Sequence, residues 1–189
     1  YIALTQFARE KFIQGGLPAE KIVVKPNFAY PDPGVRNGKG EYALFVGRLY
    51  PEERVRTVLA AWERLRSHIP LQIIGSGLQR AELEAFAAKR GLSSVSFLGH
   101  LPHDRTLAAI KGARFLLFAS EWYESFPVTI AEAFACGVPV IASRLGAMAE
   151  IVEDGRTGLH FSPGDADDLA AKVEWAWTHP KEMETMGRA

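Results

Sequence analysis

The sequence has little cysteine, no excess charge of either sign and no long apolar run, and each shortage excludes a class of protein. Cys136 is the single cysteine among 189 residues, which excludes an intrachain disulfide and any metal site built from several thiolates. Basic and acidic residues number 22 each, so the formal net charge is zero and no overall field attracts nucleic acid. No apolar run reaches the length of a membrane span.

Metal ligands are also sparsely placed. Asp165 and Asp167 spell an acidic pair around Ala166, but the helical pattern that follows predicts a capping role for them. The five histidines form no pair at helical i, i+4 spacing; they stand at positions 68, 100, 103, 160 and 179. We therefore expect no metal site.

What the sequence does contain is a regular alternation of short apolar runs and amphipathic segments. This pattern is typical of a doubly wound α/β domain, in which a parallel sheet is covered by helices on both faces. We expect strands at 42–46, 71–74, 95–98, 115–119, 138–142 and 158–161, and helices at 55–67, 79–90, 105–111, up to 136 and at 166–178.

The first 40 residues differ from the rest. A helix over 3–14, capped by Thr5 and ended by Gly15 and Gly16, precedes a short strand at 21–25. Residues 26–40 are rich in proline and glycine, which predicts a linker or surface loop. We place the start of the compact domain near Glu41. The chain begins at Tyr1 without a methionine, and we expect it to be a piece of a longer protein.

The most informative stretch is SEWYESFPVTIAEAFACGVPVIAS, residues 120–143. Glu124 follows an apolar strand, and Glu132 lies eight positions further on, in the predicted helix. Eight helical residues span about 12 Å and return to nearly the same face. Ligands of open parallel sheets bind beyond the carboxyl ends of strands. The two carboxylates thus suit a long ligand with hydroxyls at both ends.

Four other strand ends carry candidate residues with competing structural explanations. Gly47 and Arg48 could grip a phosphate, although a surface arginine after a turn explains them equally simply. The Gly-Ser-Gly run from Gly75 is either a tight turn or a place where a phosphate approaches a helix N-terminus. His100 alone is more often a loop histidine than a catalyst. Glu150, beyond the fifth strand, is either near a site or a structural cap.

The E-x7-E spacing, the small-residue helix and the CGVPVIAS segment resemble the signature of family 4 retaining glycosyltransferases, the group 1 transferases of GT-B fold. The resemblance extends from IALTQFAREKF near the start to the helix at 166–178. It implies that residues 1–40 are a remnant of the N-terminal domain plus the interdomain linker. Residues 41–189 would be the C-terminal donor-binding domain, which takes a nucleotide-diphosphate sugar.

The resemblance also implies a role for each candidate residue. Glu124 would lie near the sugar as the catalytic carboxylate, and Glu132 would bind the ribose hydroxyls of the donor. Other residues would contact the diphosphate, sugar or base, largely through backbone groups; they are Gly47, Arg48, Gly75, His100, Leu101, Ser125, Phe126 and Val128. No metal or other cofactor would be required.

One position departs from the family pattern. Where the family has a lysine and a glycine that meet the diphosphate, this chain has Glu53 and Arg54. A carboxylate there reverses the charge beside two phosphates and should weaken binding at short range. Arg54, one residue further on, is the candidate substitute.

The implied reaction transfers a sugar to an acceptor hydroxyl with retention, and this piece should bind donor but be inactive without the N-terminal acceptor domain. The alternatives are a GT-B-fold nucleotide-sugar epimerase and a non-catalytic module with a degraded diphosphate site. The resemblance favours a cytoplasmic protein and leaves open peripheral association of the full-length protein with the inner membrane surface. The exposed cleft face and the helix bearing Trp175 and Trp177 suggest self-association.

Overall fold

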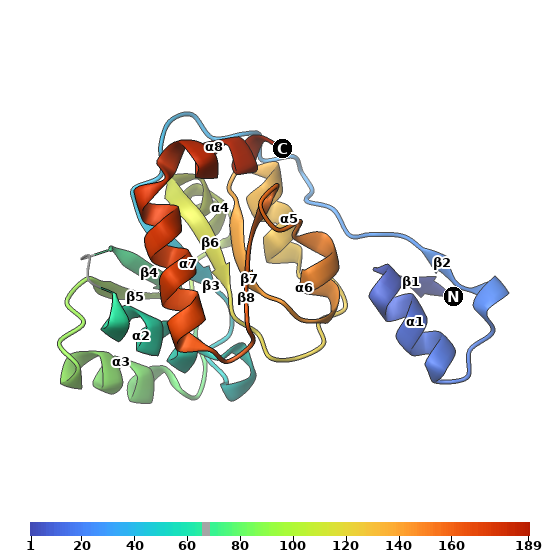
Figure 1. Cartoon of the computed structure of the whole chain (residues 1–189), viewed down its shortest axis with the longest axis horizontal. Helices are drawn as coiled ribbons and strands as arrows, with labels where there is room; N and C mark the ends of the chain where they lie inside the picture. Colours follow the sequence, from blue (N-terminus) through green and yellow to red (C-terminus); the bar gives the residue numbers. More distant parts are fainter. Residues whose placement is uncertain (66–68) are drawn as a thin grey trace.

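A computed structural model describes residues 1–65 and 69–189 and has one large parallel sheet (Figure 1). Its six strands lie in the order β5-β4-β3-β6-β7-β8, and every neighbouring pair is parallel. The strands are β3 Tyr42–Val46, β4 Leu71–Ile74, β5 Val95–Gly99, β6 Ala113–Phe118, β7 Val140–Ser143 and β8 Gly158–Phe161. This confirms the predicted fold class.

Helices cover both faces of the sheet. The bounds are α2 Val55–Arg64, α3 Arg80–Lys89, α4 His103–Gly112, α5 Val128–Ala135, α6 Gly146–Ile151, α7 Ala166–Thr178 and α8 Pro180–Arg188. Buried side chains of α2, α3, α7 and α8 share one apolar cluster with the sheet, and those of α4, α5 and α6 share another. Along β3, Phe45 enters the first cluster and Leu44 the second, because successive strand side chains point to opposite faces.

The first 25 residues form a small unit beside the sheet (Figure 1). β1 (Ile2–Ala3) pairs in parallel with β2 (Val23–Val24), and a 3₁₀ turn, η1 (Ala19–Lys21), leads into β2. The helix α1 (Gln6–Gln14) begins three residues later than expected because Ile2 and Ala3 pair as a strand. The predicted caps are confirmed: the Thr5 side chain accepts from the Ala8 amide, and Gly15 ends the helix.

Residues 26–40 contain no helix or strand, as the proline-rich composition predicts. This segment leaves the small unit and runs over the sheet domain before β3 begins (Figure 1). The Lys111 ammonium donates a hydrogen bond to the Pro33 carbonyl, and the Arg36 guanidinium donates one to the Ala113 carbonyl. The division into a remnant and a donor domain stays a prediction.

Several predicted boundaries were wrong. The strand expected at 138–142 begins at Val140, because the Val138 amide still closes the end of α5 on the Ala133 carbonyl while Gly137 turns the chain at φ +71°. Helix α4 starts two residues before the predicted position. Helices α6 and α8 were not predicted. The end of the helix expected at 55–67, and His68, lie outside the described residues.

The helix that carries the tryptophans is packed rather than free. Trp175 stacks on His179 with ring centroids 4.5 Å apart, and the Arg114 guanidinium lies 3.8 Å from the Trp177 ring centroid. Both tryptophans also pack against the first apolar cluster. The tryptophans of α7 are thus packed within the chain, and self-association stays a prediction.

Candidate functional site

The candidate residues gather where the strands end. The loops after β3, β4, β5, β6 and β7 all emerge at one edge of the sheet, hereafter the carboxyl edge, because these strands are parallel. The chain order reverses between β3 and β6, which lie side by side although β4 follows β3 in sequence. In open α/β sheets, ligands bind at such a switch point.

The loops on either side of the switch point are joined by an ion pair. The Nε of Arg54, after β3, lies 3.0 Å from Oε2 of Glu121, after β6. A hollow of about 310 Å³ opens here and is lined by Pro51, Arg54, Glu121 and Trp122. Glu121 was not among the predicted site residues, because its distance from Arg54 in the sequence gives no signal of the pairing.

Gly47, Gly75 and Gly77 allow the loops after β3 and β4 to pack backbone to backbone. A Cβ added at Gly75 would lie 1.8 Å from the Gly47 carbonyl oxygen, and one at Gly77 would lie 2.4 Å from the Leu49 carbonyl oxygen. The Gly47 amide donates to Ile74, and the Leu49 amide to Ser76. This close packing accounts for the Gly-Ser-Gly run without a ligand; contact of Gly47 or Gly75 with a donor stays a prediction.

Arg48 extends from the carboxyl edge, and its side chain is 75% exposed. Its Nε lies 3.6 Å from Oε1 of Glu53, whose side chain is mostly buried. The other Glu53 oxygen lies beside Gly47. The carboxylate that departs from the family pattern thus occupies the end of β3 and partly neutralises the arginine expected to bind the diphosphate.

Arg54 has a left-handed backbone, with φ +52° and ψ +36°. It ends the 3₁₀ turn η2 (Pro51–Glu53) and begins α2. A non-glycine residue in this conformation is uncommon and carries strain. The conformation fits the glycine of the family pattern at this position. The Arg54 side chain pairs with Glu121 in the loop after β6. Its contact with the diphosphate beside Arg48 stays a prediction.

Glu124 lies in the loop before α5, since that helix begins at Val128. Its Oε1 accepts a hydrogen bond of 3.3 Å from the Ser120 hydroxyl. Eight helical residues therefore do not separate Glu124 from Glu132, because Pro127 caps the helix and leaves Glu124 outside it. That both carboxylates face one side stays a prediction. The two carboxylates come from a loop and a helix that follow the same strand.

Glu132 lies on α5 with its side chain only 13% exposed, and its Oε1 is 2.8 Å from Nε2 of His103. His103 is the first residue of α4, so this contact joins the helix after β6 to the helix after β5. His103 was not among the predicted site residues. No spacing rule connects residues 29 positions apart on two helices.

The remaining predicted residues lie along the same loops. Ser125 is exposed, Phe126 is half-buried and Val128 begins α5 with an exposed side chain. His100 is exposed after Gly99, while Leu101 packs against the second apolar cluster and its carbonyl accepts from the Thr106 hydroxyl at 3.4 Å. Ligand contacts by these residues stay predictions.

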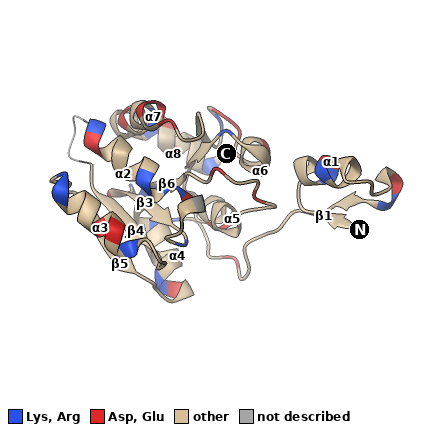
Figure 2. Cartoon of the chain, turned by 90° about the horizontal axis from the view of Figure 1, so that it is seen from below, with Lys and Arg blue, Asp and Glu red and all other residues tan. Residues whose placement is uncertain are grey.

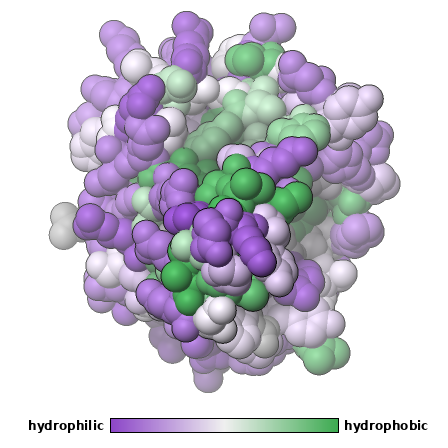
Figure 3. Space-filling model, turned by 90° about the vertical axis from the view of Figure 1, so that its right-hand side faces the viewer, coloured by the Kyte–Doolittle hydropathy of each residue, from purple (hydrophilic) through white to green (hydrophobic). Residues whose placement is uncertain are grey.

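Glu150 serves as a structural cap. Its two carboxylate oxygens each accept a backbone hydrogen bond of 2.8 Å, from the amides of Gln6 and Phe7 in the first turn of α1. Next to it, the Phe7 and Tyr123 rings meet edge to face at 4.9 Å. Figure 3 shows apolar surface between hydrophilic groups on this side of the molecule. Glu150 thus ties the N-terminal unit to α6.

The described residues contain no group of three or more His, Cys, Asp or Glu side chains that could hold a metal. Asp165 caps α7, Asp167 pairs with Arg64, and Asp168 accepts from Ser162. Basic and acidic residues are interspersed over the ribbon (Figure 2). Among residues 1–65 and 69–189, no helix has the length and apolar character needed to cross a membrane.

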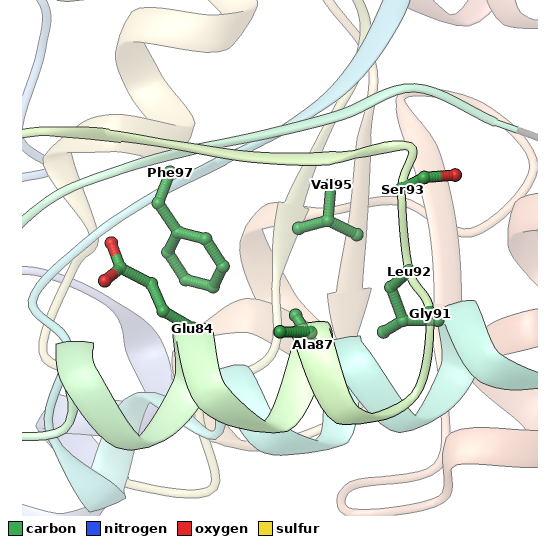
Figure 4. A pocket seen from close by; sticks show the side chains of 8 residues that line it. Glu84, Ala87, Gly91, Leu92, Ser93, Val95 and Phe97 are labelled. Carbon is green, nitrogen blue, oxygen red and sulfur yellow. The ribbon is translucent and has the colours of Figure 1, made fainter.

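A second hollow, of about 380 Å³, lies between α3 and the edge strand β5 (Figure 4). Its lining is mostly apolar, with Ala87, Leu92, Val95 and Phe97, and Glu84 at one end. Residues 91–93 precede β5, so this groove reaches toward the amino end of the strand, away from the candidate residues. We do not assign it to the site.

The fold is a doubly wound α/β domain of the Rossmann-like class found in GT-B proteins. A family model described as "Glycosyl transferases group 1" matches residues 28–189. The chain therefore belongs to the group 1 glycosyltransferases.

Relatives agree with this membership. The chain is 37% identical over 158 residues to a glycogen synthase of Mycobacterium tuberculosis, covering 82% of this chain and 38% of that protein. It is 32% identical over 201 residues to a D-inositol 3-phosphate glycosyltransferase of Kribbella flavida, covering 94% and 47%. The chain thus spans less than half the length of these relatives.

A solved structure of similar fold is HepE from Anabaena in complex with UDP. It matches with a TM-score of 0.89 and 24% identity, over 99% of this chain and 56% of that one. At this identity the likeness concerns the fold.

Proposed function

We propose that this chain is the donor-binding domain of a retaining family 4 glycosyltransferase, which transfers a sugar from a nucleotide-diphosphate sugar to an acceptor hydroxyl. The observation that carries the proposal is the position of Glu132. Its mostly buried carboxylate contacts His103 at the start of α4, directly after the loop whose residues are expected to border the nucleotide base. Glu124 follows β6 in the loop that leads into the same helix, α5.

The chemistry follows from these groups. Two adjacent ribose hydroxyls donate hydrogen bonds to the Glu132 carboxylate, which accepts through both oxygens. The amides at the start of α5 and the Arg48 guanidinium face the diphosphate and stabilise the charge that develops as it leaves. Glu124 lies on the sugar side. No metal is invoked, and the acceptor is bound by a part of the protein outside this chain.

A non-catalytic module with a weakened diphosphate site is the second candidate. The pairing of Arg48 with Glu53 favours it, because the carboxylate competes with phosphate for the same guanidinium. The two candidates share a nucleotide site and differ in how strongly it binds phosphate.

Calorimetric titration with UDP, GDP and ADP tests the proposal. We expect one of the three to bind the unmodified chain. Glu132→Ala should weaken that binding about tenfold to a hundredfold, the equivalent of lost hydrogen bonds to a charged group. Glu53→Lys should tighten it about tenfold, because a cation then replaces an anion beside two phosphates.

Glu82→Ala is the matched control, since Glu82 is exposed on α3 and pairs with Arg56; its affinity should equal that of the unmodified chain. Absence of binding to all three nucleotides by the unmodified chain and by Glu53→Lys, with melting curves that show folded protein, would contradict the donor site. Binding that rises in Glu53→Lys from an undetectable level favours the module.

A further inference from the structure

The His103–Glu132 contact joins two elements that meet at the carboxyl edge. His103 opens α4 immediately after its cap Pro102, and Glu132 lies in the middle of α5. The His103 Nε2 and Glu132 Oε1 atoms are 2.8 Å apart, which is within the usual range for a hydrogen bond between nitrogen and oxygen. Both helices pack their apolar sides into the same cluster, with Ile110 from α4 and Ile130 from α5. The two backbones that carry the pair are therefore fixed relative to each other.

The burial of the two side chains is unequal. Glu132 is 13% exposed and His103 is 58% exposed. A carboxylate removed from water needs a hydrogen-bond donor, and its helix neighbours Ala131 and Ala133 have no polar side chain. Within the part of the chain that the structure describes, the contact with His103 is the one side-chain hydrogen bond of Glu132. The imidazole is thus what orients this carboxylate.

We propose that His103 is a positioning residue that holds the Glu132 carboxylate ready for the ribose of the donor. The inference rests on the function proposed above. A carboxylate accepts about four hydrogen bonds, so His103 occupies one lone pair of Oε1 and leaves Oε2 and the second lone pair of Oε1 for two sugar hydroxyls. Holding the plane of the carboxylate in advance removes part of the ordering cost of binding.

This role predicts a specific signature. His103 acts on the ribose hydroxyls only through Glu132, so its removal should weaken binding of a ribonucleotide more than binding of the corresponding 2′-deoxyribonucleotide. A structural defect would instead weaken both equally. The informative quantity is the ratio of the two dissociation constants, measured for UDP, GDP and ADP and their 2′-deoxy counterparts by calorimetry.

We expect the unmodified chain to prefer the ribonucleotide of one pair. In His103→Ala the ratio of the two dissociation constants should shrink about threefold to tenfold, because the net free energy of one hydrogen bond corresponds to a factor of this size. His103→Gln, whose amide N–H can donate over a similar reach, should restore most of it. Arg105→Gln, an exposed position two residues further along α4, is the matched control and should keep the full preference.

The outcomes separate this inference from the function on which it rests. If the unmodified chain binds one nucleotide with ribose preference and His103→Ala or, should that variant not fold, His103→Phe keeps the same preference, the positioning role is wrong and the donor site stands. If the Gln variant behaves as the Ala variant, hydrogen bonding is not the cause and the proposal also fails. If no nucleotide binds the unmodified chain, the donor site itself is wrong.

Discussion

At the scale of single residues, His160 is a buried polar group in an otherwise apolar strand. It lies on β8, where its backbone amide donates to Asp154 at 2.8 Å. Within the described residues its ring Nε2 is buried and has no hydrogen-bond partner. Burial lowers the pKa of the imidazole below its ordinary value of 6.5, because the charged ring would lose its hydration.

This gives a pH dependence of stability. The unfolded chain takes up a proton near pH 6.5, whereas the folded chain resists it, so the contribution is complete above that pH and is lost as the pH falls. We expect the melting temperature to decrease from pH 7.5 to 5.5. Protonation of this one group lowers the free energy of unfolding by at most about 1.4 kcal/mol per pH unit. His160→Gln, which cannot be protonated there, should flatten the profile measured by thermal denaturation. An unchanged slope in that variant would show that other groups cause the decrease.

Some residues of the site could be predicted from the sequence, but the residues that contact them could not. Glu132 and Arg48 could be named because each stands in a recognisable local motif. Their partners, His103 and Glu53, interact through contacts between loops and helices that spacing does not encode. The sequence did flag Glu53 as a reversed charge, but not that its carboxylate lies against Gly47 and pairs with Arg48.

At the scale of elements, α1 depends on a side chain from α6. The first amides of a helix have no partner within the helix. Here Glu150 accepts from Gln6 and Phe7, and Thr5 accepts from Ala8. The negative carboxylate also complements the positive end of the helix. Loss of Glu150 should therefore loosen the N-terminal unit without disturbing the sheet.

Glu150→Ala should cost α1 about 1 kcal/mol, the usual worth of a helix cap. Hydrogen exchange followed by mass spectrometry should show about fivefold faster exchange in residues 6–10, while β3 and β6 remain protected. The control is Glu10→Ala, which removes an exposed carboxylate from the same helix and should leave exchange at the first turn unchanged. Equal protection in Glu150→Ala and the unmodified chain would contradict the capping role.

Element types could be predicted better than element ends. β3, β4 and β8 were predicted at their observed bounds because each is a short apolar run between turn residues. Helix α6 was missed because its six residues are too few to show a periodicity, and α8 because Pro180 was not taken as a helix start. Glu124 was placed at the junction of strand and helix, and it lies in the loop before α5, whose N-cap is Pro127.

At the scale of the whole molecule, the sheet class could be predicted, but its strand order could not. The order places β6 beside β3 and so creates the switch point, and this depends on pairings between strands about 70 residues apart. The same topology brings Arg54 to Glu121 and α4 to α5. The site is thus a product of the fold as a whole, built from loops that are separate in sequence.

The most direct measurement is a crystal structure of the chain soaked with UDP, GDP or ADP. We expect a nucleotide at the carboxyl edge, with its ribose hydroxyls about 3 Å from the Glu132 carboxylate and its phosphates toward Gly47 and the start of α5. A nucleotide seated elsewhere, for example in the groove between α3 and β5, or one whose ribose points into solvent away from Glu132, would contradict the central claim.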